Sequence, residues 1–263
     1  MPVRSPLLNV MDAAARKAAR GLLRDFGEVE QLQVSTKGPG DFVSAADHRV
    51  EKTLVQELKK ARPDYGFLLE ESGVIAGADQ RTTWVIDPLD GTTNFLHGIP
   101  HFAISIGLVR DGEPYAGVIY QPLTDEMFAA EKGSGAFVNE HRLRVSGRRQ
   151  LDTSVIATGI PHNGRPGTER FLRQLPRVME ATAGVRRFGS ATLDLAYVAA
   201  GRYDGFWEIG LKPWDIAAGI IIVREAGGYV SELDGANLME TGSILASNDH
   251  LHTPLAALLA GTR

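Results

Sequence analysis

Three features of this 263-residue sequence predict a mixed α/β fold. Two amphipathic segments near the N-terminus have apolar residues every three or four positions, the spacing of a helix that packs on a core. Short apolar segments that end in acidic residues follow, and their β-branched and aromatic residues predict buried strands. The next part of the chain alternates apolar segments with tight turns, as an antiparallel sheet does.

The composition favours a globular protein and excludes several classes. With 43% hydrophobic residues, we expect one domain over residues 1–263, with sub-regions of roughly 1–145 and 146–263. There is no apolar run of about 18 residues and no secretory signal pattern, so we expect a cytoplasmic protein without a membrane segment. The absence of cysteine excludes thiolate metal sites and leaves an oxygen-liganded cation as the expected metal. The net charge of −4 argues against direct nucleic-acid binding.

Two helices are predicted at the start of the chain. The first covers residues 5–27, with an apolar stripe of Leu7, Met11, Ala14, Ala18, Leu22 and Phe26. The second begins at Ser44, a residue type suited to the N-cap, and ends at Pro63. Between them, residues 36–41 contain two glycines and a proline, which predict a loop. Asp47 lies in the first turn of the second helix, where it is either a capping acid partnered by Ser44 or a catalytic acid.

Two consecutive strands are expected to end in carboxylates. Residues 65–69 predict the first strand, and Glu70 and Glu71 follow it directly. Residues 72–83 predict a loop, and the second strand then leads into Asp87. If the two strands are parallel neighbours, their carboxylates lie together at one edge of the sheet.

The stretch Trp84–Asn94 predicts a cation site beside an anion site. Pro88 and Gly91 are expected to stop the strand and turn the backbone, so that Asp87 and Asp90 converge. Two such carboxylates repel each other unless a cation lies between them. Behind them, the amides and hydroxyls of Gly91, Thr92 and Thr93 would form an anion cradle if a helix or turn begins there. The alternative is an ordinary structural turn, since Asp and Gly are common turn residues.

An antiparallel run follows. A turn at residues 110–113 joins the strands 103–109 and 115–120 into a hairpin. Further strands are predicted at residues 127–130, 135–138 and 143–145. His97 and His101 flank this run, and they are either ligands or, as is more usual beside Gly and Pro, loop residues.

The second half of the chain alternates strands and helices. Strands are predicted at residues 155–158, 203–208, 229–231 and 244–247, and helices at residues 165–181, from Ser190 to Gly201, and at residues 216–226 and 251–260. Pro176 would kink or end the first of these helices. Glu208 is a third acid at a strand end. Asp215 opens the helix 216–226, where it is either a functional acid or a helix N-cap.

Five acids thus lie at element ends: Asp47, Glu70, Asp87, Asp90 and Asp215. Isolated structural roles do not account for so many acids beside an anion cradle. The sequence also resembles the inositol monophosphatase family of metal-dependent phosphatases, most closely its bacterial inositol-1-monophosphatases. The resemblance rests on Glu70–Ser72, Trp84–Phe95 and Pro213–Gly219, with further matches at Lys37–Asp47, Gly189–Ala191 and Gly205–Gly210. Ser44, where many relatives have Thr, is a small departure.

The resemblance implies a five-layered α-β-α-β-α sandwich of the inositol monophosphatase / fructose-1,6-bisphosphatase type. It also implies a homodimer, sensitivity to lithium, and two to three Mg²⁺ ions per site. By residue-for-residue likeness, Glu70, Asp87, the Leu89 carbonyl and Thr92 would hold one ion. A second ion would lie among Asp87, Asp90 and Asp215, and a third, weaker one near Glu70.

The implied activity is Mg²⁺-dependent hydrolysis of myo-inositol monophosphate to inositol and phosphate by a metal-activated water. Thr92 would orient that water, with Asp47 as the proton acceptor and Glu70 as a further catalytic residue. The amides of Gly91 and Thr92 would bind the phosphate. The inositol ring would contact Asp90, Gly189, Ala191 and Glu208, and Glu208 is the expected selectivity residue because a carboxylate accepts two hydrogen bonds from neighbouring hydroxyls.

Three other hypotheses stay open. A phosphatase with an aspartyl nucleophile is disfavoured, because its second Asp usually lies two residues on and here Asp87 and Asp90 are three apart. Members of the same family act on histidinol phosphate, fructose 1,6-bisphosphate, adenosine 3′,5′-bisphosphate or NADP. Bacterial members can also associate with RNA polymerase or transcription factors, a binding role for which Arg186–Arg187 is the one hint in the sequence.

Overall fold

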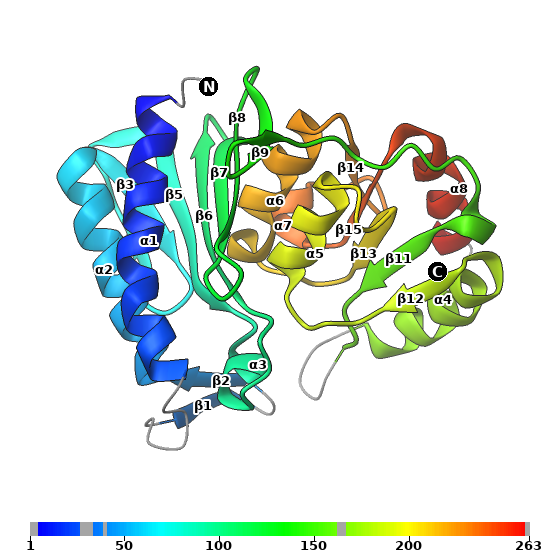
Figure 1. Cartoon of the computed structure of the whole chain (residues 1–263), viewed down its shortest axis with the longest axis horizontal. Helices are drawn as coiled ribbons and strands as arrows, with labels where there is room; N and C mark the ends of the chain where they lie inside the picture. Colours follow the sequence, from blue (N-terminus) through cyan, green and yellow to red (C-terminus); the bar gives the residue numbers. More distant parts are fainter. Residues whose placement is uncertain (1–4, 27–33, 39–40, 162–166, 261–263) are drawn as a thin grey trace.

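The computed structural model describes residues 5–26, 34–38, 41–161 and 167–260, with the backbone alone at residues 34–38 and 41–44. Helices and sheets stack in five alternating layers (Figure 1), which confirms the predicted α-β-α-β-α sandwich. From one side to the other, the helical layers are α1 (Pro6–Phe26) with α2 (Ala45–Ala61), α5 (Ala191–Ala199) with α6 (Pro213–Glu225), and α4 (Thr168–Ala181) with α8 (Asp249–Ala260). Among the described residues, no helix combines the length and apolar character needed to span a membrane.

The larger sheet has eight strands in the order β10-β9-β8-β7-β6-β5-β3-β4. In chain order these are β3 (Tyr65–Leu69), β4 (Gly73–Ile75), β5 (Asp79–Asp90), β6 (Ala103–Arg110), β7 (Glu113–Gln121), β8 (Glu126–Glu131), β9 (Gly135–Val138) and β10 (His141–Arg142). β3 and β5 are parallel neighbours, with Leu69 opposite Ile86, so the condition for their terminal carboxylates to meet is fulfilled. The predicted hairpin is confirmed, and its turn uses positive φ at Asp111 and Gly112.

β5 differs from the prediction at both ends. It begins at Asp79, inside the segment predicted as a loop, and it continues through Pro88 to Asp90. The pairing with β6 shifts between Asp87 and Asp90, which makes a β-bulge. A proline is tolerated at a bulge because its missing N–H is not needed there. The two aspartates are therefore brought together by a bulged strand end and not by a tight turn.

The smaller sheet has the order β12-β11-β13-β15-β14. Its strands are β11 (Val155–Thr158), β12 (Gly184–Arg186), β13 (Gly205–Glu208), β14 (Tyr229–Glu232) and β15 (Ile244–Ser247). Short edge elements were the ones missed: β4, β12 and the helix α7 (Leu238–Thr241) lie at exposed or half-exposed positions that carry little apolar periodicity. The strand predicted at residues 143–145 is wrong in its position, because the strand found there, β10, ends at Arg142. The Leu143 N–H still bonds to the Ala136 carbonyl of β9, whereas the Val145 N–H bonds to the Ala226 carbonyl after α6.

The N-terminal loop prediction is also corrected. β1 (Val34–Gly38) and β2 (Asp41–Ser44) pair as a short antiparallel hairpin, and Pro39 and Gly40 between them lie outside the described residues. The side chain of Ser44 lies outside them too, so its N-cap role stays a prediction. The predicted helices agree with α1, α2, α5, α6 and α8 to within a few residues, and α4 contains Pro176 without ending there.

The central helix α6 is buried on nearly all sides and packs very close to the larger sheet. A Cβ atom at Gly107 on β6 would lie 2.8 Å from the Ala217 Cβ, and one at Gly117 on β7 would lie 2.6 Å from the Ala218 carbonyl oxygen. The two glycines thus let the helix backbone approach the strands. This approach brings the first turn of α6, with Asp215, to the edge where β3 and β5 end.

Candidate active site

A pocket lies where β3, β5, β11 and β13 end and where α3 (Thr92–Leu96), α5 and α6 begin. Its lining includes the predicted residues Glu70, Asp87, Leu89, Asp90, Gly91, Thr92, Gly189, Ala191, Glu208 and Asp215. Asp47 is not part of the lining, but it reaches the pocket through Thr92 (below). The structure therefore brings together side chains that lie up to 145 positions apart in the sequence.

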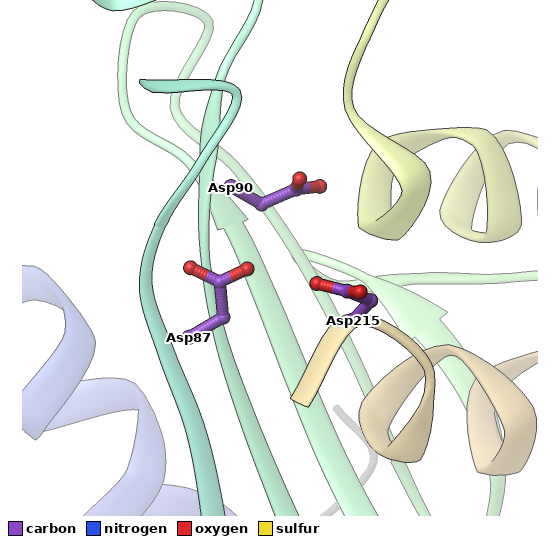
Figure 2. Close-up of side chains that lie close together, drawn as sticks. All are labelled: Asp87, Asp90 and Asp215. Carbon is purple, nitrogen blue, oxygen red and sulfur yellow. The ribbon is translucent and has the colours of Figure 1, made fainter. Parts of the chain in front are cut away.

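Three carboxylates converge at one end of this pocket. Asp87 and Asp90 come from β5 and Asp215 from α6, and Figure 2 shows their side chains directed toward one shared space. One oxygen from each carboxylate lies within 4.8 Å of the others, close enough to hold a metal ion. The predicted convergence of Asp87 and Asp90 is thus confirmed, and Asp215 joins them from the other side of the pocket.

The protein holds Asp87 and Asp215 through backbone donors. Asp87 Oδ1 accepts a hydrogen bond from the Leu89 N–H at 2.9 Å. Asp215 is the third residue of α6 and not its N-cap, and its Oδ2 accepts from the Lys212 N–H at 2.7 Å. The simple N-cap alternative for Asp215 is therefore wrong, although the carboxylate does satisfy a donor at the helix start.

Asp90 is held most strongly, by the first turn of α5. Its Oδ2 accepts from Ser190 Oγ at 2.6 Å, from the Thr192 N–H at 2.8 Å and from Thr192 Oγ1 at 2.6 Å. Ser190 is also the N-cap of α5, where its Oγ accepts from the Leu193 N–H. These bonds fix one Asp90 oxygen and connect β5 of the larger sheet to the central helices.

The electrostatics of the cluster favour a bound cation. Asp87 is only 2% exposed. Burial, followed by the charges of Glu70, Asp90 and Asp215, raises the pKa of Asp87 well above its usual range. A cation among these groups would remove the repulsion, and a set of carboxylate and carbonyl oxygens suits a hard divalent ion.

Gly91 and the start of α3 line the pocket beside the carboxylates, where the sequence predicts an anion cradle. Gly91 has a φ of 94° and immediately precedes α3, and a Cβ there would lie 3.0 Å from the His101 carbonyl oxygen. Glycine is therefore required by both backbone conformation and space. The helix beginning at Thr92 leaves its first N–H groups directed toward the pocket end, where they can bind a phosphate oxygen.

Thr92 links the cradle to Asp47. Its Oγ1 lies 3.2 Å from Asp47 Oδ1 and 2.9 Å from the Leu89 carbonyl oxygen. The hydroxyl has one proton, so it can donate fully to only one of these two acceptors. Asp47 is completely buried in the first turn of α2, and its contact with Thr92 connects it to the pocket.

The pocket lining also contains residues that the sequence analysis did not assign to the site. Asp194 lies within α5, and Gly159, Ile160 and Arg187 line the same pocket as Glu208. A Cβ at Gly159 would lie 2.0 Å from the Glu208 Cδ, so the Glu208 carboxylate packs directly on this glycine. The sequence signal that could have identified Asp194 is an acid inside an otherwise apolar helix, residues 191–199.

The two histidines have loop roles. His97 Nδ1 lies 2.8 Å from the Thr93 carbonyl oxygen, and the His101 carbonyl accepts a hydrogen bond from Asn94 Nδ2. The His101 ring packs against Phe188, and burial lowers its pKa. Neither residue belongs to the carboxylate cluster found among the described residues.

An α-β-α-β-α sandwich with a carboxylate cluster beside a helix-start cradle defines an enzyme class: phosphatases that use bound metal ions. Comparison with known proteins agrees. The model of the inositol monophosphatase family matches residues 4–262. An inositol-1-monophosphatase from Mesorhizobium japonicum is 58% identical over 96% of this chain and 95% of its own length. The chain belongs to the inositol monophosphatase family, and it is an enzyme of this type, a phosphatase.

Two further relatives extend the comparison. The Nus factor SuhB of Escherichia coli K12 is 44% identical over 98% of this chain and 96% of that protein. The crystal structure of the extragenic suppressor protein suhB from Bartonella henselae superposes with a TM-score of 0.94 at 56% identity, covering 97% of this chain and 98% of the other.

Proposed function

We propose that this phosphatase hydrolyses inositol monophosphate to inositol and phosphate and that it requires Mg²⁺. The observation that carries the proposal is one pocket lined by a carboxylate cluster, by the start of α3 and by the Glu208 carboxylate. The carboxylate cluster and the start of α3 suit a phosphate with its metal ions, and Glu208 suits a polyol. The M. japonicum relative is named for this activity.

The proposal places two to three Mg²⁺ ions in the pocket, supported by the cluster of Asp87, Asp90 and Asp215. Glu70, Asp87, the Leu89 carbonyl and Thr92 would hold one, Asp87, Asp90 and Asp215 a second, and Glu70 would lie near a third. Bound Mg²⁺ supplies positive charge to phosphate oxygens and lowers the pKa of water. Its preference for oxygen ligands matches this set.

The remaining steps fall to the chain's own groups. The N–H groups of Gly91 and Thr92 would hold phosphate oxygens and stabilise the charge that develops there. The Thr92 hydroxyl would orient the attacking water by accepting a hydrogen bond from it. The same hydroxyl would donate a hydrogen bond to Asp47 Oδ1, 3.2 Å away. This relay requires the Thr92 proton to turn from the Leu89 carbonyl to Asp47.

Glu208 is the proposed selectivity residue. Its carboxylate ends β13 and packs on Gly159, and it can accept hydrogen bonds from two neighbouring hydroxyls. Asp90, Gly189 and Ala191 would contact the same ring. The alternative substrates are histidinol phosphate, fructose 1,6-bisphosphate, adenosine 3′,5′-bisphosphate and NADP. They remain alternatives because the residues that bind the phosphate would contact the same group in each of them.

The test is phosphate release by the purified protein from inositol 1-phosphate and from the four alternatives, each with and without Mg²⁺. Asp90→Asn serves as the blank. We expect Mg²⁺-dependent release with the highest kcat/KM for inositol 1-phosphate. A higher kcat/KM for another substrate would overturn the role of Glu208, and no release above the blank would overturn the phosphatase proposal itself.

A second role, association with the transcription machinery, is favoured by the similarity to the E. coli Nus factor SuhB. Arg186 is exposed on the edge strand β12, whereas Arg187 lines the pocket, so only Arg186 remains a purely surface candidate. We expect Arg186→Glu to reduce RNA polymerase capture and keep phosphate release, and Asp90→Asn to do the opposite. Loss of both properties in either variant would contradict the separation.

Three finer features belong to the same proposal: a homodimer, a cytoplasmic location and inhibition by Li⁺. Sedimentation velocity tests the first, and fractionation of cells tests the second. Titration of Mg²⁺-saturated enzyme with LiCl, with KCl as the matched salt control, tests the third.

A further inference from the structure

Asp194 is a buried acid in the pocket that the proposed mechanism leaves without a role. It is the fourth residue of α5, it is 1% exposed, and it lines the pocket with Glu208. Its Oδ1 has no hydrogen-bond partner among the residues that the structure describes. Native proteins rarely leave a buried polar atom in this state, and a ligand that supplies the missing partner would explain it.

A helix-capping role does not account for Asp194. The donors at the start of α5, from Ser190 and Thr192, are directed to Asp90 instead. Asp204 provides an instructive contrast, because it is almost equally buried at 3% exposure. Its Oδ2 accepts from the Val155 N–H at 2.8 Å, and its Oδ1, which like Asp194 Oδ1 has no hydrogen-bond partner among the described residues, lies 3.3 Å from Arg148 Nε. Asp204 therefore has one backbone donor and a neighbouring guanidinium, whereas the Asp194 carboxyl has no hydrogen bond or ion pair with the residues that the structure describes.

The groups that face Asp194 favour its uncharged form. Glu208 lies on β13, Asp90 on β5, Arg187 follows β12 and Tyr203 precedes β13. Burial, then the charge of Glu208, then that of Asp90 raise the pKa of Asp194 well above its usual range, and Arg187 opposes them. Arg187 forms no ion pair with Asp194 among the described residues. A protonated carboxyl has an O–H to donate.

We propose that Asp194 binds the substrate, donating a hydrogen bond from its protonated carboxyl to one hydroxyl while Glu208 accepts from a neighbouring hydroxyl. The pair would recognise a phosphate monoester of a polyol with adjacent hydroxyls. This inference rests on the proposed phosphatase function and adds a donor to the acceptor already assigned there. A donor and an acceptor side by side match vicinal hydroxyls, each of which both donates and accepts.

The experiment compares Asp194→Leu and Asp194→Asn on two substrates. Inositol 1-phosphate has the ring hydroxyls, and phenyl phosphate lacks them. We expect Asp194→Leu to raise KM for inositol 1-phosphate about tenfold and to leave KM for phenyl phosphate unchanged. Asp194→Asn keeps an N–H donor of similar shape and should stay within about threefold of the wild type on both.

Asp204→Asn is the matched control, and it should lower Tm without changing KM for one substrate more than for the other. The proposal would be overturned if Asp194→Leu changed KM equally for both substrates or for neither. It would also be overturned if Asp194→Asn raised KM for inositol 1-phosphate as much as Asp194→Leu does. If the Leu variant does not fold, the pH dependence decides. KM of the wild type for inositol 1-phosphate should rise at high pH as the carboxyl loses its proton, and KM of Asp194→Asn should not.

Parallel pH profiles would overturn the inference. Release of phosphate from phenyl phosphate by the wild type reports on the phosphatase function separately. If the wild type is active on phenyl phosphate but the Asp194 variants change KM equally for both substrates, the role of Asp194 is contradicted and the phosphatase function is not. A wild type inactive on both substrates contradicts the function on which the inference rests.

Discussion

Two parts of the pocket are built in different ways: the carboxylate end, formed by Asp87, Asp90 and Asp215, and the hydroxyl end, formed by Asp194 and Glu208. At the carboxylate end, donors from the protein fix one oxygen each of the three aspartates. At the hydroxyl end, Asp194 Oδ1 is buried without a hydrogen-bond partner among the described residues, and the Glu208 carboxylate packs on Gly159. The first end is thus preorganised by the protein, and we propose that a ligand completes the second.

The largest effect is expected from Asp215→Asn at the carboxylate end. The amide keeps the bond to the Lys212 N–H but removes a charge that the cation site needs. Phosphate release should fall about 10³-fold, as it should when Mg²⁺ is removed with EDTA. Steady-state kinetics and Mg²⁺ titration calorimetry check this. Asp249→Asn, at the exposed start of α8, is the control, and equal behaviour of the two variants would contradict the assignment.

A smaller loss is expected from Thr92→Val. The valine keeps the shape and removes the hydroxyl that reaches Asp47, so kcat should fall about 10²-fold. Thr92→Ser restores a hydroxyl at the same position and should recover most of the rate. If Thr92→Ser is as slow as Thr92→Val, the relay to Asp47 is not what the residue provides.

Gly159→Ala tests the hydroxyl end. The new Cβ would lie 2.0 Å from the Glu208 Cδ and displace the carboxylate, so KM for inositol 1-phosphate should rise about tenfold. KM for phenyl phosphate should not change. Gly147→Ala is the matched control, since a Cβ at Gly147 has nothing within 4 Å. A parallel loss on both substrates would remove the distinction between the two ends.

The smallest effect concerns stability. The pKa of Asp87 is raised, so without metal its charged form destabilises the fold, and stability falls as pH rises through that pKa. At pH 7 and in EDTA, Asp87→Asn should therefore raise Tm by about 2–4 °C. In saturating Mg²⁺ the wild type should be the more stable protein. Differential scanning calorimetry checks both, and a lower Tm of the variant in EDTA would contradict the repulsion argument.

The convergence of Asp87 and Asp90 was predictable because both lie in one stretch, whereas Asp215 reaches them from α6. Trp84–Asn94 supplies the strand, both aspartates and the cradle, and only the bulge that carries Asp87 and Asp90 was mistaken for a turn. The order of layers came from family resemblance, since periodicity gives elements and not their stacking. Asp194 was missed because its neighbours Leu193 and Leu195 predict only a buried helix. Its chemistry follows from where β13 and β5 lie, which no local pattern encodes.

The hydrogen bonds from Ser190 and Thr192, at the start of α5, to Asp90 also affect the order in which parts of the molecule fold. The bonded groups are about a hundred residues apart in sequence, so closing them requires a long loop and both sheets in place. Contacts of such range tend to form late, after the local hairpins and helices. The cation site would then be among the last parts to assemble. An ion bound there should mainly slow unfolding, with little influence on the rate of folding.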